Sequence, residues 1–141
     1  MLAWAMATSA AAADPVAYDV ADGVIAESLT GEQGEPVRGR AIVAGRAGNC
    51  LACHHAPIPE QEFHGDLGPD LAGVGARLGE GALRLRLVDP KRISEETIMP
   101  AFYALDGLTR VAQRYRDQTI LSAEQIEDVV AYLMTLTDPA R

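Results

Sequence analysis

The sequence predicts an all-α fold, and three stretches of the chain support that prediction. Near the C-terminus, Ser122 and Gln125 have the spacing of a capping box, which marks the start of a helix. The apolar face of this helix consists of Ile126, Val129, Val130, Leu133 and Thr137. Another apolar stripe follows Pro36, which suits the first position of a helix. Residues 81–88 alternate as a strand would but also fit one helical face, and we predict a helix because a lone strand would have no partner.

The chain before Pro36 is less regular. Residues 14–35 contain several glycines, and we predict an N-terminal extension with one short helix over 20–29. In the helix that starts at Pro36, Gly39 and Ala41 are small enough to let another helix approach closely, although glycine lowers helix propensity.

The composition limits the size class and the partners of the chain. Its 141 residues are enough for one small domain. A net charge of −8 and a pI of about 4.7 disfavour a nucleic-acid partner. The alanine-rich residues 1–13 are interpreted as the end of a secretory signal with cleavage near Ala13, although a basic region is missing. No later stretch approaches the roughly 18 apolar residues of a membrane span.

Both cysteines of the chain lie in one five-residue motif, Cys50-Leu51-Ala52-Cys53-His54. Two thiols three positions apart on one turn can add to the two vinyl groups of one haem, and the next histidine then binds the iron. The motif predicts one covalent haem c, with Cys50 and Cys53 as thioethers and His54 as an axial ligand. Because bacteria attach haem c on the periplasmic side of the membrane, the motif and the signal together predict a periplasmic protein.

Two haem-free alternatives use the same residues. A Cys-x-x-Cys pair can be a redox dithiol, but the βαβ pattern of thioredoxin-like proteins is not found around it. The pair can also form half of a zinc site, for which His55 and His64 could supply ligands only in an irregular arrangement.

A loop after the motif offers a group that could orient His54. Residues 56–75 are too rich in proline and glycine to be regular for long, and they include Gly68-Pro69-Asp70-Leu71. An axial imidazole usually donates its other ring N–H to a carbonyl, and Pro69 presents its carbonyl on a rigid turn. We therefore predict that the Pro69 carbonyl orients His54. An ordinary Gly-Pro turn is the alternative.

The candidates for the second axial ligand are Met99, Met134, His55 and His64. Met134 belongs to the C-terminal helix, where a methionine usually packs in the core. His55 directly follows the first ligand and cannot cross the ring, and His64 is more typical of a solvated or propionate-side imidazole. Met99 precedes a proline in the predicted loop 94–121, which leaves its thioether free to point inward. With Met99 as ligand the iron has no open position, so the haem should only transfer electrons.

Taken together, these features resemble a class I cytochrome c domain, in which helices wrap around one covalent haem, over residues 36–137. Several tracts are similar to the SoxX family, the monohaem cytochrome subunits of the periplasmic sulfur-oxidation (Sox) system. The similar tracts are 48–54, 65–75, 88–91, 97–103 and 126–133.

The resemblance implies a heterodimer with a SoxA-type cytochrome. It also implies that this heterodimer acts as an L-cysteine S-thiosulfotransferase. In that family the complex joins thiosulfate to a cysteine of the carrier protein SoxYZ, at a cysteine-ligated haem of the partner. The SoxX-type haem accepts the electrons and passes them to a small cytochrome c. The family's covalent pair corresponds to Cys50 and Cys53, and its axial pair corresponds to His54 and Met99.

A freestanding electron shuttle is the rival hypothesis. The extension before Pro36 and the tract 101–103 favour a partner-bound subunit, because a minimal shuttle needs neither. Four basic residues are interpreted as a solvated face, with a docking edge near the haem as the alternative. They are Arg84, Arg86, Lys91 and Arg92.

Overall fold

The computed structural model describes residues 15–139, so the predicted signal, residues 1–13, lies outside the described part. The α-helices within 15–139 are α1 (Pro36–Ala44), α2 (Val74–Arg77), α3 (Glu80–Val88) and α4 (Ala123–Thr135). Three short 3₁₀ helices accompany them, η1 (Cys50–Ala52), η2 (Pro90–Arg92) and η3 (Gln113–Tyr115). The described residues contain no strand beyond one isolated bridge, which confirms the all-α prediction.

The two predicted helix starts are present, and side chains cap both. In α4 the Ser122 hydroxyl accepts from the Gln125 N–H at 3.2 Å, and the Gln125 side chain accepts from the Ser122 N–H at 2.9 Å. Pro36 is the first residue of α1, and the Glu35 carboxylate accepts from two N–H groups of the first turn. These backbone donors hold the pKa of Glu35 below its ordinary value. Each cap satisfies donors that the helix itself leaves unpaired.

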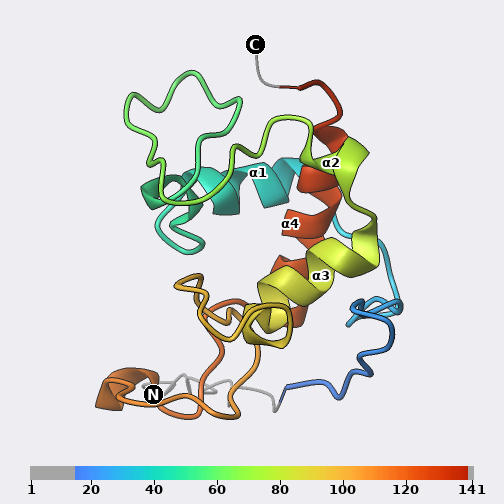
Figure 1. Ribbon diagram of the computed structural model, residues 1–141, viewed down its shortest axis with the longest axis vertical. Helices are drawn as coiled ribbons and strands as arrows, with labels where there is room; N and C mark the ends of the chain where they lie inside the picture. Colours follow the sequence, from blue (N-terminus) through green and yellow to red (C-terminus); the bar gives the residue numbers. More distant parts are fainter. Residues whose placement is uncertain (1–14, 140–141) are drawn as a thin grey trace, which may run out of the picture.

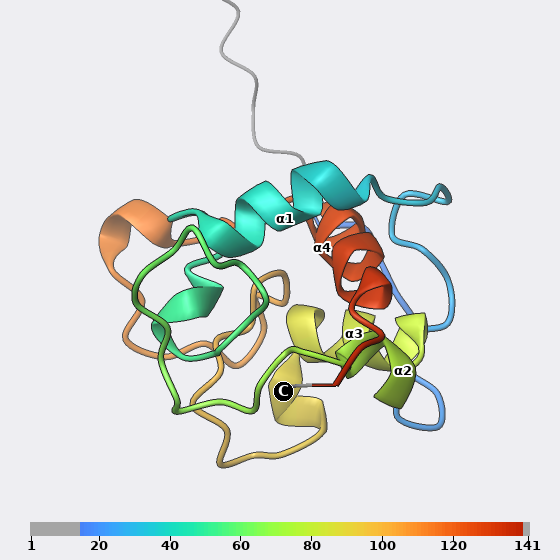
Figure 2. The same cartoon turned by 90° about the horizontal axis from the view of Figure 1, so that it is seen from above.

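Helix α1 packs across α4, and a glycine makes the close approach possible (Figures 1 and 2). Gly39 is buried, and a Cβ at this position would overlap the backbone carbonyl of Asp128. Next to Gly39 in the sequence, Arg38 forms a two-pronged ion pair with the Asp128 carboxylate, with N–O distances of 2.7 and 2.8 Å. The hydrogen bond from Arg38 holds the pKa of Asp128 below its ordinary value.

Replacing Gly39 by alanine should lower the free energy of unfolding by about 3 kcal/mol, the upper end of the cost of overpacking. The added methyl group meets backbone atoms of Asp128, so a side-chain movement cannot relieve the overlap. Denaturant unfolding measures the effect. Gly79→Ala is the matched control, because no atom lies within 4 Å of a Cβ there. Equal stability of the Gly39 and Gly79 variants would contradict the close packing of α1 on α4.

The prediction of a helix over 20–29 is wrong. Ala21 and Val24 exchange two backbone hydrogen bonds, at 3.1 and 3.0 Å, across a two-residue turn. The turn residues, Asp22 and Gly23, both have positive φ, at 51° and 75°. An Asp-Gly pair is typical of such tight turns, and it interrupts the predicted helix.

The extension nevertheless packs firmly on the helices. Ile25 and Leu29 are buried, and the Ile25 N–H donates to the Gly81 carbonyl of α3 at 3.1 Å. In both views the extension, in blue, lies on the opposite side of α4 from the segment 50–73, in green (Figures 1 and 2). The extension therefore contributes two residues to the domain core and leaves the other side of α4 to the Cys50–His54 motif.

Arg84 corrects the interpretation of the basic residues as a solvated face or docking edge. Its side chain is only 3% exposed and forms a two-pronged ion pair with Glu127 of α4, which is equally buried. Arg84 also donates to the carbonyl of Ile25, and Glu127 accepts from the Leu29 N–H. The pair therefore joins α3, α4 and the extension. Of the other three, Lys91 and Arg92 are exposed and Arg86 is half-buried.

Candidate haem site

The Cys50–His54 motif forms one tight turn that places its three functional side chains together. Asn49 has left-handed backbone dihedrals, with φ at 49°, and starts η1. The Cys50 carbonyl then accepts from the N–H groups of Cys53, at 3.1 Å, and His54, at 2.9 Å. The two cysteines therefore flank a single turn, and the imidazole begins where it ends.

The burial of Cys50 argues against a redox dithiol. Their thiols do not form a disulfide, and both residues are partly buried. Burial raises the pKa of the Cys50 thiol to about 11. A reactive dithiol needs a lowered pKa to supply the thiolate nucleophile, so Cys50 lacks this property.

His54 is oriented by the loop that follows the motif. Its Nδ1 lies 2.7 Å from the Pro69 carbonyl oxygen, so Nδ1 carries the proton and donates it. Backbone bonds fix the loop against the motif, because Gly68 donates to the Cys53 carbonyl at 2.7 Å and Leu71 donates to the His55 carbonyl at 2.9 Å. The Nε2 atom is thereby left as the acceptor of the ring, the state in which an imidazole binds a metal ion.

Gly68 has a role that the sequence analysis did not assign. A Cβ at this position would lie 2.6 Å from Nδ1 of His54 and would overlap the neighbouring ring carbon. The residue was visible as part of a Gly-Pro pair, but its contact with the imidazole follows only from the folded loop. The imidazole ring of His54 therefore packs directly against the backbone at Gly68.

Replacing Gly68 by alanine should displace the His54 ring or the loop. We expect a loss of unfolding free energy of about 1–3 kcal/mol, as for other overpacked sites, and a smaller fraction of chain recovered with haem. Haem content per protein and denaturant unfolding measure the two effects. Gly107→Ala serves as a control away from the site, since nothing lies within 4 Å of a Cβ there, although its positive φ adds a small strain. Full haem content with unchanged stability in the Gly68 variant would contradict this packing.

The structure places Met99 and Met134 in different surroundings. Met99 is half-buried at the edge of the core, and its N–H donates to Thr97 Oγ1 at 3.2 Å. The gold segment 90–105 and the green segment 50–73 lie on the same side of α4 in both views (Figures 1 and 2). Met134 is also half-buried, but it belongs to α4, at the point where α2 packs. The contact is close there, because a Cβ at Gly75 of α2 would lie 2.6 Å from the Met134 carbonyl oxygen. Only Met99 therefore comes from a loop on the side of the His54 motif.

His55 and His64 form a pair of their own beside the motif. The centres of their rings are 4.7 Å apart, His55 Nδ1 lies 3.1 Å from an Asp70 carboxylate oxygen, and His64 Nδ1 accepts from the Ala56 N–H at 3.2 Å. They border a surface hollow of about 340 Å³. Within residues 15–139, no three His, Cys, Asp or Glu side chains are grouped to hold a metal ion. The zinc alternative therefore gains no support.

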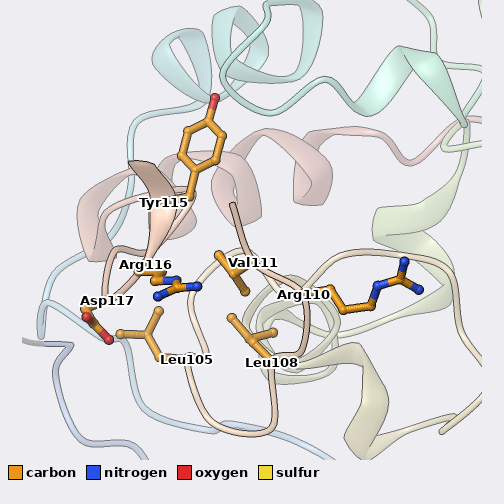
Figure 3. Close-up of a pocket in the computed structure, with 7 residues that line it drawn as sticks. All are labelled: Leu105, Leu108, Arg110, Val111, Tyr115, Arg116 and Asp117. Atoms are coloured by element: carbon orange, nitrogen blue, oxygen red, sulfur yellow. The ribbon is translucent and has the colours of Figure 1, made fainter. Parts of the chain in front are cut away.

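A second hollow, of about 320 Å³, lies within one segment of the long loop before α4 (Figure 3). Its lining combines apolar side chains with charged ones. These residues are Leu105, Leu108, Arg110, Val111, Tyr115, Arg116 and Asp117. None of the predicted site residues borders it.

Comparison with known proteins identifies the family. The model of the cytochrome c family matches residues 36–137. A chain in the crystal structure of SoxXA from P. pantotrophus is 39% identical, with a TM-score of 0.80, over 91% of this chain and 100% of that chain. This chain belongs to the SoxX family of c-type cytochromes. No curated protein sequence matches it.

Membership of this family confirms the resemblance drawn from the sequence. As a SoxX-type cytochrome, the chain carries covalently bound haem c, and Cys50 and Cys53 match the attachment motif. The residues present fit this group, because two unpaired thiols share one turn with an imidazole whose Nε2 is left as acceptor. None of the helices within residues 15–139 is long and apolar enough to cross a membrane.

Proposed function

We propose that this SoxX-type cytochrome is the electron-transfer subunit of a SoxAX complex and carries a single haem. The observation that carries the proposal is the 39% identity over the full length of a chain in the SoxXA structure. Cys50 and Cys53 would hold the haem through thioethers, and His54 and Met99 would bind its iron. Since the chain has only two cysteines, it has one covalent attachment motif.

The surroundings of His54 support its role as the first ligand. The hydrogen bond to the Pro69 carbonyl fixes the tautomer and the ring orientation, and such a bond also makes the metal-binding nitrogen more basic. When bound, haem supplies a reversible one-electron step at its iron. Met99 as the second iron ligand would raise the reduction potential, and two protein ligands would leave no position for substrate.

The chemistry of thiosulfate is therefore assigned to a partner chain. We place this subunit in the periplasm, in a heterodimer with a SoxA-type cytochrome. That complex joins thiosulfate to a cysteine of the SoxYZ carrier, and this chain takes up the released electrons and passes them to a small cytochrome c. The extension over residues 15–35, which Ile25 and Leu29 attach to the core, also favours a subunit over a minimal shuttle, which has no need of such an extension.

Size-exclusion chromatography with a SoxA-type cytochrome distinguishes the subunit from the freestanding shuttle. The haem-loaded chain should elute alone as a monomer and, after mixing, in one peak with the partner at equal stoichiometry. An unrelated monohaem cytochrome c of similar size is the control and should not shift. A chain that remains monomeric in the mixture would contradict the assignment to a SoxAX complex and leave the shuttle.

A further inference from the structure

We infer that the N-terminal extension holds the Met99 loop, residues 90–105, in place through a hydrogen bond between Val16 and Tyr103. This inference rests on the proposed ligation by His54 and Met99. It makes Tyr103 and the backbone of Val16 positioning groups for the second axial ligand, a role that the sequence analysis did not give to either residue.

The Met99 loop is fixed mainly on its C-terminal side. Phe102 donates to the Leu87 carbonyl of α3 at 2.9 Å, and Ala104 donates to the Val88 carbonyl at 3.0 Å. On the other side, residues 91–96 and Ile98 are exposed, and the Met99 N–H bonds only to the nearby Thr97. The position of the Met99 sulfur therefore depends on how firmly residues 102–104 are held.

Tyr103 lies in the centre of this anchored stretch and reaches the extension. Its side chain is buried, and its hydroxyl oxygen accepts from the Val16 N–H at 2.7 Å. The ring of Tyr18 lies against it, with ring centres 6.5 Å apart. The Val16 side chain is 48% exposed, so the contribution of this residue is its backbone N–H rather than apolar packing. Residues 87 positions apart in the sequence are joined by this one bond.

The far end of the extension is fixed independently, so the extension links the core to the Met99 loop. We call residues 15–35 the strap. Ile25 donates to the Gly81 carbonyl, Arg84 donates to the Ile25 carbonyl, and Leu29 donates to Glu127. The strap therefore runs from the buried ion pair to the loop that follows Met99. A local opening that frees Met99 would have to break the Val16–Tyr103 bond or carry the strap with it.

The inference is tested by adding imidazole to the ferric, haem-loaded protein. Imidazole must displace Met99 from the iron, so its apparent affinity reports how often the loop opens. The readout is the loss of the sulfur-to-iron charge-transfer band. Tyr103→Phe removes the hydroxyl from a buried ring, and Val16→Pro removes the N–H. Each should tighten imidazole binding by about fivefold, the equilibrium factor of one net hydrogen bond, and the double variant should add little more.

Two control variants separate this effect from a general loss of stability. Val16→Ala keeps the N–H and should bind imidazole as the unmodified protein does. Ile126→Val lowers global stability in the core and leaves both partners of the Val16–Tyr103 bond unchanged, so it should also leave the affinity unchanged. Affinities of Tyr103→Phe and Val16→Pro within 1.5-fold of the unmodified protein would overturn the inference, as would an equal gain in Ile126→Val.

Failure of the proposed ligation would be seen separately. If the unmodified ferric protein lacked the charge-transfer band, or if Met99→Leu retained it, Met99 would not be the ligand and the proposed function would need revision. A band that depends on Met99 but is indifferent to Tyr103 and Val16 would overturn only the positioning role of the strap.

Discussion

Replacing Met99 by leucine should remove the sulfur-to-iron charge-transfer band of the ferric protein and lower its reduction potential. Leucine has a similar volume, so the loop can stay packed while the iron loses its thioether. Because axial ligands set haem potentials over a range of about 0.8 V, we expect a fall on the order of 0.1 V or more. Visible absorption and a redox titration measure the two effects.

Met134→Leu is the matched control, since both methionines are half-buried at the edge of the core. The Met134 variant should keep the band and the potential, because the Met134 side chain packs against the hydrophobic core. The opposite result, with the band lost in the Met134 variant and kept in the Met99 variant, would show that the wrong methionine has been assigned.

Replacing Arg84 by alanine should lower the free energy of unfolding by about 3–5 kcal/mol, as expected when one partner of a buried ion pair is removed. Glu127 would remain buried without its ionic partner, and the Ile25 carbonyl would lose its charged donor. Denaturant unfolding of the haem-loaded protein measures the loss. Arg86→Ala on the same helix is the control, since Arg86 is half-buried and its side chain bonds to the Ala82 carbonyl, within α3.

The double variant Arg84→Met/Glu127→Leu separates the ion pair from the packing around it. Apolar side chains of similar volume can replace a buried pair at small cost, so this variant should be more stable than Arg84→Ala. It should still be less stable than the unmodified protein, because Ile25 and Leu29 lose their side-chain partners. A cost for Arg84→Ala no larger than that for Arg86→Ala would contradict the view that the extension is locked to the core.

The local features of this chain could be predicted from its sequence, because neighbouring residues determine them. The capping box at Ser122 needs only a residue three positions away, and the turn around Cys50 places its reactive groups within five positions. The smallness of Gly39 also indicated a close helix contact correctly, although the partner helix was not named.

Features that depend on distant residues could not be predicted in the same way. In the sequence, Arg84 alternates with leucines, as an exposed residue of a strand or a helix would. Its burial is explained by the ion pair with Glu127, which lies 43 positions later. The contact between Gly68 and the His54 ring likewise appears only once the loop has folded back. The turn at Asp22-Gly23 is a different case, because the Asp-Gly pair is a local turn signal within the range that was predicted as a helix.

In the proposed function, this haem takes up the electrons of a reaction that occurs on another chain. The most direct measurement is the absorbance of this haem after thiosulfate and the SoxYZ carrier are added to the oxidised protein, with and without a SoxA-type cytochrome. We predict reduction only when the partner is present, and no change when the carrier lacks its reactive cysteine. Reduction of the isolated chain by thiosulfate and carrier, or no reduction in the complete mixture, would contradict the account.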